Sequence, residues 1–148
     1  AMDIMRMESG FLHWGHDISP EENQYQAGLS FTISSKKEVD FIGKQALEKI
    51  KKEKLKSRFV MLTLKESKPG EPLLLHDEPI YLGDRIIGQT TSGNYSFIYD
   101  KNLSFGYIST NLSNEELLSK KIYIEVEKKK YESEINLSPL KNNNFKNL

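Results

Sequence analysis

Two runs near the C-terminus decide the fold class: Ile122-Tyr123-Ile124-Glu125-Val126 and Tyr131-Glu132-Ser133-Glu134-Ile135-Asn136-Leu137. Apolar and polar residues alternate in both runs, which is the pattern of a β-strand with one buried face. A lysine-rich turn separates them. We therefore expect two adjacent strands, with the two isoleucines and the valine of the first run facing inward.

Four shorter runs between residues 58 and 108 carry the same strand signals. Their β-branched and aromatic residues suit a pleated sheet, and turn residues separate them. Six or so short strands in about 80 residues predict a small antiparallel barrel or sandwich. The stretch from Gly88 to Gly93 is predicted to be rich in turns. The four runs are Phe59–Leu64, Ile80–Leu82, Arg85–Ile87 after a two-residue turn, and Phe105–Ile108.

The N-terminal third mixes helix and strand patterns. Ile4–Glu8 has the pattern of a short helix, whereas Leu29–Ile33 alternates apolar and polar residues as a strand does. Asp40 is the expected N-cap of an amphipathic helix from about Gly43 to Lys54. This part of the chain is therefore predicted to be a small α/β unit.

These elements divide the chain into three parts. Residues 1–56 are predicted to form the α/β appendage, residues 57–140 an antiparallel six-stranded β-barrel, and residues 141–148, rich in Asn and Lys, a frayed tail. Inside the barrel part, the capping-box pattern Ser113–Glu116 predicts one helical turn over Asn114–Leu118. The predicted fold class is α+β.

The composition excludes several classes of function. The 148 residues hold 21 Lys and Arg against 21 Asp and Glu, so the chain lacks the positive charge of a dedicated nucleic-acid or anionic-membrane binder. Cysteine is absent, which excludes disulfides, thiolate metal sites and a cysteine nucleophile. No apolar run approaches the ~20 residues that span a bilayer, and no signal peptide is visible. We expect a cytoplasmic protein with no nucleic-acid partner and no membrane partner.

Three patterns suggest a function, and each has a simpler structural interpretation. The lysines among residues 49–56 suit a solvated helix face better than a nucleic-acid patch. His13-Trp14-Gly15-His16-Asp17 has residues that bind metals, but a hydrogen-bonded turn is the better interpretation, and His76 is expected to lie far off. Ser92 lacks the pattern of a nucleophile elbow and is assigned to a tight turn. No metal site and no catalytic residue are predicted.

Arg6 is one of three arginines in a chain otherwise rich in lysine. Selective use of arginine indicates planar, bidentate hydrogen bonding, and the simpler alternative is an ordinary exposed helix residue. Glu8 lies two positions further on and points to another side of the helix, so the two side chains are not expected to pair.

Several separate motifs, in the right order, resemble the glycine-cleavage T-protein superfamily of tetrahydrofolate-dependent aminomethyltransferases. The resemblance covers roughly residues 4–140. It implies that residues 1–56 are the C-terminal remnant of the family's folate-binding domain and residues 57–140 its C-terminal β-barrel domain. His13-Trp14-Gly15 and Glu78-Pro79-Ile80-Tyr81 are more similar to the folate domains of dimethylglycine and sarcosine dehydrogenases. The motifs are Arg6–Ile18, Ala27–Phe31, Asp40–Leu47, Asp77–Tyr81, Gly88–Gly93 and Gly106–Ile108.

The resemblance implies a folate-contacting role for three residues. Arg6 matches the arginine of the family's Arg-x-Glu-x-Gly helix, which contacts the pteridine of the folate, and Glu8 is the glutamate of that pattern. Trp14 matches an aromatic residue that lines the folate cavity. A guanidinium offers forked donors to a ring carbonyl and nitrogen, and an aromatic face stacks on a flat heterocycle. The implied cofactor is tetrahydrofolate, bound in the complete enzyme, with no metal.

The sequence also departs from the family. No residue matches the family's catalytic aspartate near folate N10 or the glutamate that grips the pteridine, and Leu118-Ser119-Lys120 replaces a common Pro-Gly turn. The resemblance thus implies the C-terminal portion of an enzyme that transfers a one-carbon unit from an amine donor to tetrahydrofolate. We expect this portion to form part of the folate cavity wall and not to be catalytically complete by itself.

Two interpretations of function stay open. The chain either belongs to such an enzyme, with folate and an N-terminal catalytic half as partners, or is a non-catalytic β-barrel interaction module. If this chain supplies only some of the walls of the folate cavity, Trp14 and Phe11 would be unusually exposed. Such an exposed apolar surface would favour self-association. The simpler alternative is a monomer in which residues 1–35 fold back on the barrel and bury Trp14.

Overall fold

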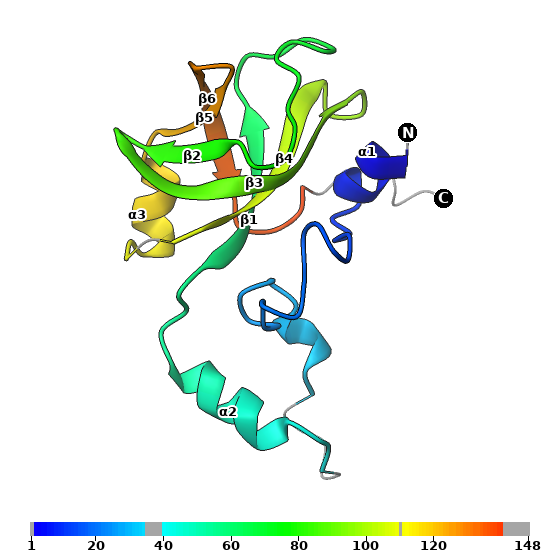
Figure 1. The fold of residues 1–148 in the computed structure, drawn as a ribbon, viewed down its shortest axis with the longest axis vertical. Helices are drawn as coiled ribbons and strands as arrows, with labels where there is room; N and C mark the ends of the chain where they lie inside the picture. The colour runs from blue at the N-terminus through cyan, green and yellow to red at the C-terminus, as the bar shows by residue number, and fades with distance from the viewer. Residues whose placement is uncertain (1, 35–39, 110, 141–148) are drawn as a thin grey trace.

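Six antiparallel strands close into a barrel in the order β1-β4-β3-β2-β5-β6 (Figure 1). The computed structural model describes residues 2–34, 40–109 and 111–140. The closed strand order confirms a barrel instead of a sandwich. The predicted tail lies outside the described residues. The predicted division near residue 57 stays a prediction. The strands are β1 (Arg58–Leu64), β2 (Pro79–Leu82), β3 (Arg85–Ser96), β4 (Lys101–Ile108), β5 (Ile122–Val126) and β6 (Lys129–Asn136).

The main core of the molecule consists of side chains from one face of each strand. Ile122, Ile124 and Val126 are almost fully buried, as the alternating pattern predicted. They pack with Leu62 of β1 and Ile80 of β2 in one apolar cluster. At about 25 cal/mol per Å² of apolar surface removed from water, burial of such side chains is the largest favourable term in folding the barrel.

A second apolar cluster covers the opposite face of β1 and β4. Met61 of β1 and Phe105 of β4 pack there against Met7 of the N-terminal helix α1 (Met2–Glu8), and all three are almost completely buried. Figure 1 shows α1 lying against the barrel beside β3 and β4. Helix α1 therefore anchors the N-terminal segment to the outside of the barrel.

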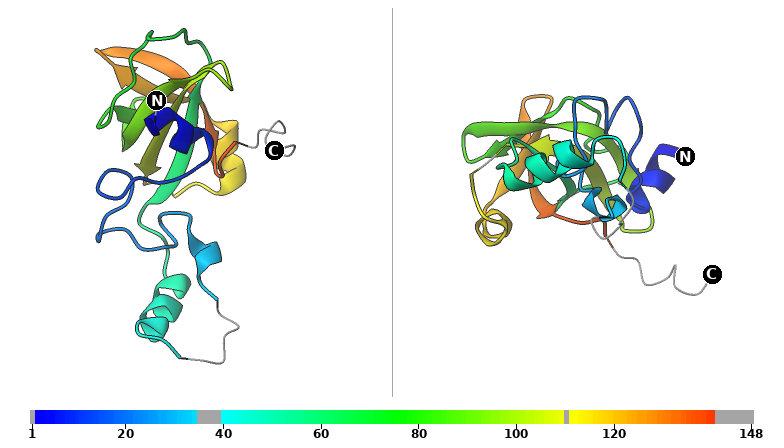
Figure 2. Two further views of the ribbon diagram at one scale, coloured as in Figure 1. Left: turned by 90° about the vertical axis from the view of Figure 1, so that its right-hand side faces the viewer. Right: turned by 90° about the horizontal axis from the view of Figure 1, so that it is seen from below.

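The later part of the N-terminal third, residues 29–34 and 40–52, extends away from the barrel (Figure 2). The expected strand at residues 29–33 is wrong: Ser30–Thr32 is a 3₁₀ helix, η1, because no strand of the described chain lies beside it to pair with it. The predicted helix is present as α2 (Lys44–Lys52), but its N-cap is Gly43, with φ of 91°, instead of Asp40. Of the helices in the described ranges, none is long and apolar enough to cross a membrane.

The stretch from Gly88 to Gly93 is not a turn, contrary to expectation, but the middle of the long strand β3. A close approach of the β4 backbone, and not a turn, explains the glycine at position 88. A Cβ atom at Gly88 would lie 1.9 Å from the carbonyl oxygen of Tyr107. A Cβ atom at Gly106 would likewise lie 2.6 Å from the carbonyl oxygen of Gln89. These glycines let β3 and β4 pass closely at this point of the barrel.

The predicted helical turn is present as α3 (Asn114–Ser119) and begins with a complete capping box. Ser113 Oγ accepts from the Glu116 N–H at 3.2 Å, and the Glu116 carboxylate accepts from the Ser113 N–H at 2.8 Å. This backbone hydrogen bond holds the pKa of Glu116 below its ordinary value of 4.5. The carboxylate therefore contributes its stability above the unfolded pKa and loses it as the pH falls through the lower folded pKa.

We expect Ser113→Ala to lower the free energy of unfolding by about 1 kcal/mol, because the Glu116 N–H loses the Ser113 hydroxyl as its acceptor. Urea denaturation monitored by circular dichroism measures this loss. The control is Ser119→Ala, which removes a hydroxyl from the other end of the same helix, where it donates to the exposed Glu116 carbonyl. Ser119→Ala should cost less, and equal losses would contradict a specific role of the cap.

Candidate functional site

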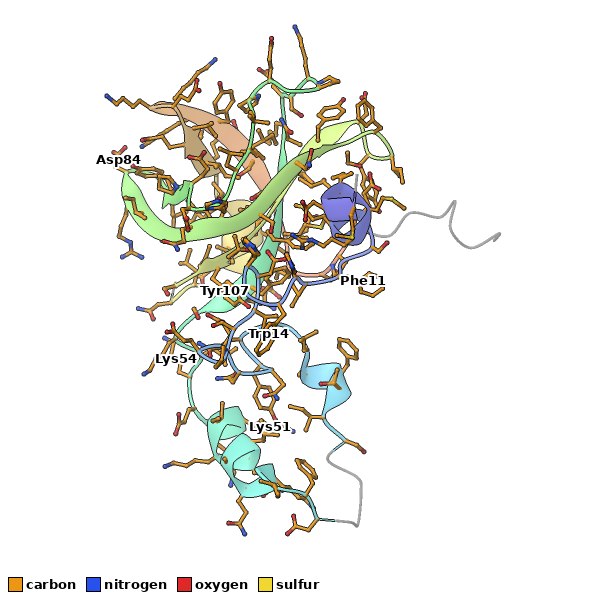
Figure 3. The ribbon with its side chains drawn as sticks, turned by 45° about the vertical axis from the view of Figure 1, so that its right-hand side comes forward. Phe11, Trp14, Lys51, Lys54, Asp84 and Tyr107 are labelled. Atoms are coloured by element: carbon orange, nitrogen blue, oxygen red, sulfur yellow. The ribbon has the colours of Figure 1, made fainter. Side chains whose placement is uncertain are left out.

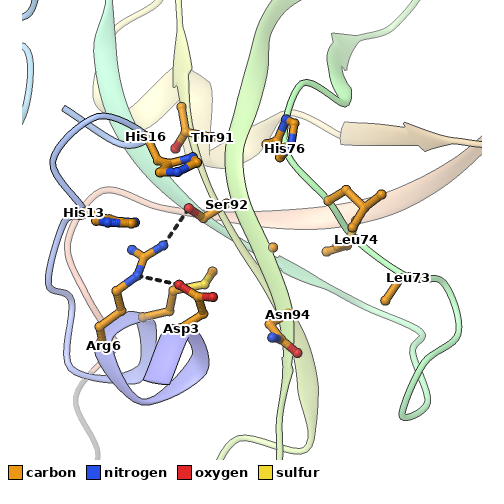
Figure 4. Close-up of a pocket in the computed structure, with 13 residues that line it drawn as sticks. Asp3, Arg6, His13, His16, Leu73, Leu74, His76, Thr91, Ser92 and Asn94 are labelled. Carbon is orange, nitrogen blue, oxygen red and sulfur yellow. Dashed lines mark hydrogen bonds and ion pairs between the residues drawn. The ribbon is translucent and has the colours of Figure 1, made fainter. Parts of the chain in front are cut away.

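Arg6, in the last turn of α1, is held by four acceptors instead of extending into solvent. Its Nη2 donates to Ser92 Oγ at 2.8 Å and its Nε to Asp3 at 3.2 Å (Figure 4). Its Nη1 donates to the Asp17 carboxylate and to the Phe11 carbonyl oxygen. Only 15% of the side chain is exposed. The guanidinium makes several hydrogen bonds, but the expected bidentate pairing with one group is absent among the residues that the structure describes, because Asp17 accepts only from Nη1 and Ser92 only from Nη2. An ordinary exposed helix residue is excluded.

Asp17 is the buried centre of this arrangement, with 1% of its surface exposed. One carboxylate oxygen accepts from Thr91 Oγ1 at 2.6 Å and from Ser92 Oγ at 2.7 Å, both on β3. The other accepts from the His13 N–H at 2.8 Å and from Arg6. A buried charge that is both paired and hydrogen-bonded in this way is stable. The hydrogen-bonded turn predicted for His13–Asp17 is therefore confirmed, and the carboxylate also ties it to the barrel.

Tyr107 on β4 also binds the His13–Asp17 turn. Its hydroxyl donates to the Asp17 carbonyl oxygen at 2.9 Å. Burial raises the pKa of the Tyr107 phenol well above its ordinary value, and the negative charges of Glu22 and Asp17 raise it further. The phenol therefore stays protonated at neutral pH and remains a hydrogen-bond donor.

Glu8 is buried against β3, with 7% of its surface exposed. Its Oε1 accepts from Ser96 Oγ at 2.6 Å. Burial, with the Glu8 charge as a smaller cause, raises the pKa of the nearby Tyr99 phenol. Arg6 and Glu8 thus have separate partners on β3, as expected from their spacing.

Trp14 and Phe11 are exposed, by 65% and 69% of their surfaces. Together with Phe31, which is 82% exposed, they line an apolar hollow of about 640 Å³. Its floor includes Phe59 and Met61 of β1. Figure 3 shows Phe11 and Trp14 on the N-terminal segment where it leaves the barrel. The predicted exposure of both aromatic rings is confirmed, and the alternative of a buried Trp14 is wrong. We call this surface the apolar face.

Comparison with known proteins identifies the barrel. The model of the glycine cleavage T-protein C-terminal barrel domain matches residues 58–141. The chain belongs to this family. It is 36% identical over 140 residues to the mitochondrial dimethylglycine dehydrogenase of Homo sapiens, covering 95% of this chain and 16% of that protein. It is 33% identical over 139 residues to the aminomethyltransferase of Listeria welshimeri, covering 94% of this chain and 36% of that protein.

The fold of this T-protein-family chain matches a solved relative. The crystal structure of glycine cleavage system aminomethyltransferase T from Bartonella henselae superposes with a TM-score of 0.73. The match covers 90% of this chain and 36% of that one at 21% identity, which shows the shared fold alone. The chain therefore spans between about a sixth and about a third of the length of these relatives.

The structure does not bring the three predicted site residues of this family member into one cavity. Arg6 lines a hollow of about 330 Å³ between α1, β3 and the loop before β2, whereas Trp14 lines the apolar face. Glu8 lines neither hollow and contacts Ser96. Their contact with folate stays a prediction.

All three histidines of the chain line the hollow around Arg6, so the expectation that His76 lies far off is wrong (Figure 4). The rings of His13 and His16 stack with centroids 4.7 Å apart, and those of His16 and His76 are 6.4 Å apart. Residue 76 reaches them because its loop runs back along β3, where Leu74 packs against Gly93. No group of His, Asp and Glu in the described part of the chain is placed to hold a metal ion.

Sequence reasoning missed the partners that fix Arg6. Asp17 was assigned only to a turn, and Ser92 to a turn between strands. Ser92 lies 86 positions from Arg6 in the sequence, and its role depends on β3 passing beside α1. No local pattern indicates such a contact.

Proposed function

We propose that this chain is the C-terminal portion of a tetrahydrofolate-dependent aminomethyltransferase-type enzyme, which transfers a one-carbon unit from an amine donor to tetrahydrofolate. In this proposal the chain forms part of the folate cavity wall. The observation that carries it is the fixed Arg6 guanidinium, at the position where the family pattern has its pteridine-contacting arginine.

The hydrogen-bonding capacity of Arg6 is compatible with a heterocyclic ligand. Arginine has five N–H donors, and four of them have acceptors within the described chain. The Asp3 side chain that accepts from Nε is 64% exposed and therefore easily displaced. Its displacement would leave Nε–H and the remaining Nη2–H as a forked pair for a ring carbonyl and nitrogen.

The role proposed for this chain is to bind and orient. No catalytic residue is assigned to it, and the proton carrier belongs to the remainder of the enzyme. That remainder is the proposed partner, and it would supply the other walls of the cavity and cover the apolar face. A cytoplasmic location is also part of the proposal.

The test is a chimaera in which this chain replaces the matching segment of the Listeria welshimeri aminomethyltransferase. We expect the chimaera to bind tetrahydrofolate and Arg6→Ala to weaken binding by about 1–3 kcal/mol, the value of a charge-assisted hydrogen bond. Calorimetric titration measures the affinity. The control is Arg85→Ala, which removes an exposed arginine from the β2–β3 hairpin and should change nothing. Equal affinities of the two variants, or no binding by the unmodified chimaera, would overturn the proposal.

The alternative function, a non-catalytic interaction module, is favoured by one observation, the exposure of three large aromatic rings on the apolar face. An apolar face of this kind drives association in the absence of a partner. We expect the isolated chain to dimerise with rising concentration in light-scattering measurements, and Trp14→Ser to weaken this self-association. Phe97→Ser, at a similarly exposed ring in the β3–β4 turn, is the matched control. A monomer at all concentrations would argue against an adhesive apolar face.

A further inference from the structure

Asp17 binds Arg6 with one carboxylate oxygen and, with the other, binds Ser92, which also binds Arg6. The side chain has no exposed surface, and four donors surround it. Two of these donors, the His13 N–H and the Arg6 Nη1–H, meet one oxygen, whereas the hydroxyls of Thr91 and Ser92 meet the other. Every strong acceptor direction of the carboxylate is therefore used within the cluster.

We propose that Asp17 is a positioning residue that fixes the orientation of the Arg6 guanidinium for its ligand. The proposal rests on the proposed function for the identity of that ligand, tetrahydrofolate. Asp17 has no contact with the ligand in this proposal and acts only through Arg6.

Ser92 connects the two side chains a second time. Its hydroxyl donates to Asp17 at 2.7 Å and accepts from Arg6 Nη2 at 2.8 Å. A hydroxyl has a single hydrogen, so its donation to Asp17 leaves its lone pairs facing Arg6. Asp17 thus holds Nη1 directly and Nη2 through Ser92.

This clamp acts on one end of the guanidinium and leaves the other end accessible. Nη1 is bound to Asp17 and to the Phe11 carbonyl oxygen, and Nη2 to Ser92, whereas Nε is bound only to the exposed Asp3. A planar group held at two of its three nitrogens cannot rotate about the Nε–Cζ bond. The edge that includes Nε therefore points in one fixed direction. Because the guanidinium is already ordered, ligand binding has a smaller entropy cost.

Asparagine at position 17 would remove this clamp with almost no change of shape. Its amide nitrogen is a donor, so it cannot accept from two of the four groups that surround Asp17. Whichever way the amide is turned, the negative charge is lost. The amide nitrogen faces either Arg6, which is also a donor, or the hydroxyls of Thr91 and Ser92, which must then accept and no longer donate to position 17. We therefore expect Asp17→Asn to free the guanidinium.

The first measurement is nitrogen-15 NMR of the arginine side chains of this chain, which has only three arginines. We expect separate Nη1 and Nη2 signals for Arg6, the mark of restricted rotation, and one averaged signal in Asp17→Asn. The exposed Arg85 is the internal reference for free rotation. Asp84→Asn makes the same chemical change at an exposed hairpin residue and should leave the Arg6 signals separate.

The second measurement is tetrahydrofolate affinity in the chimaera described above. We expect Asp17→Asn to lower the affinity at least 10-fold and Asp17→Glu to restore part of it. Asp17→Asn added to Arg6→Ala should lower the affinity no further, because Asp17 acts through Arg6. If Asp17→Asn does not fold, Ser92→Ala replaces it, since it removes the second connection and leaves the charge of Asp17 in place.

The outcomes separate this proposal from the proposed function. Separate Arg6 signals in both Asp17→Asn and Ser92→Ala would overturn the positioning role, and so would a full additional loss of affinity in the double variant. Absence of tetrahydrofolate binding by the unmodified chimaera would overturn the proposed function alone, because the NMR measurement requires no ligand.

Discussion

Replacing Gly88 by alanine should destabilise the barrel by about 3 kcal/mol or more, at the upper end of the range for overpacking. The new Cβ would lie 1.9 Å from the Tyr107 carbonyl oxygen and 2.9 Å from Ile108 Cα. Both atoms belong to the backbone of β4, which pairs with β3 at this point through Gly88 and Ile108. Relief of the clash therefore requires β3 and β4 to separate at this pair of residues.

Urea denaturation of Gly88→Ala, compared with Gly28→Ala, tests this expectation. Gly28 has a φ of 72°, and a Cβ there would have no atom within 4 Å. Its replacement introduces only the strain of a left-handed conformation, about 1–2 kcal/mol. If Gly88→Ala costs no more than Gly28→Ala, the close approach of β3 and β4 is wrong.

Replacing Asp17 by alanine should cost about 3–5 kcal/mol of folding free energy, the value for removing one partner of a buried ion pair. The Arg6 guanidinium would keep its charge, with 15% of the side chain exposed, but lose its buried counter-ion. The hydroxyls of Thr91 and Ser92 would lose an acceptor at the same time. The substitution therefore weakens the contact between the N-terminal segment and β3 of the barrel.

Asp3→Ala is the matched control because Asp3 binds the same guanidinium from the exposed side. An exposed ion pair contributes about 0–1 kcal/mol, so this variant should be almost as stable as the unmodified chain. Chemical denaturation monitored by circular dichroism measures both losses. Similar values for the two variants would show that the buried pair contributes no more than the exposed one.

Local patterns were sufficient for most of the barrel. The period-two alternation predicted β5 and β6, and the inward direction of Ile122 and Ile124 is confirmed. The capping box predicted α3 because its two hydrogen bonds join residues three positions apart. Such signals lie within a few neighbouring residues, so they hold whatever the rest of the chain does.

The errors arose where a local pattern has two structural explanations. Residues 29–33 alternate as a strand does, but a strand also needs a neighbour, and η1 has none among the described strands. Glycine is common in turns, so the glycines at residues 88–93 suggested a turn. In β3, however, the lack of a side chain at Gly88 permits the close approach of β4. Which explanation applies depends on the position of another strand.

The sequence by itself determined the barrel class, the strand faces, the helix cap and the family resemblance, because each follows from residues close together or from motifs in order. Only the tertiary structure decided the site. It placed Ser92 and Thr91 against Asp17, and His76 in the same hollow as His13. These contacts join residues more than 60 positions apart, and they form because the N-terminal segment packs against β3. No local pattern of residues encodes that distance.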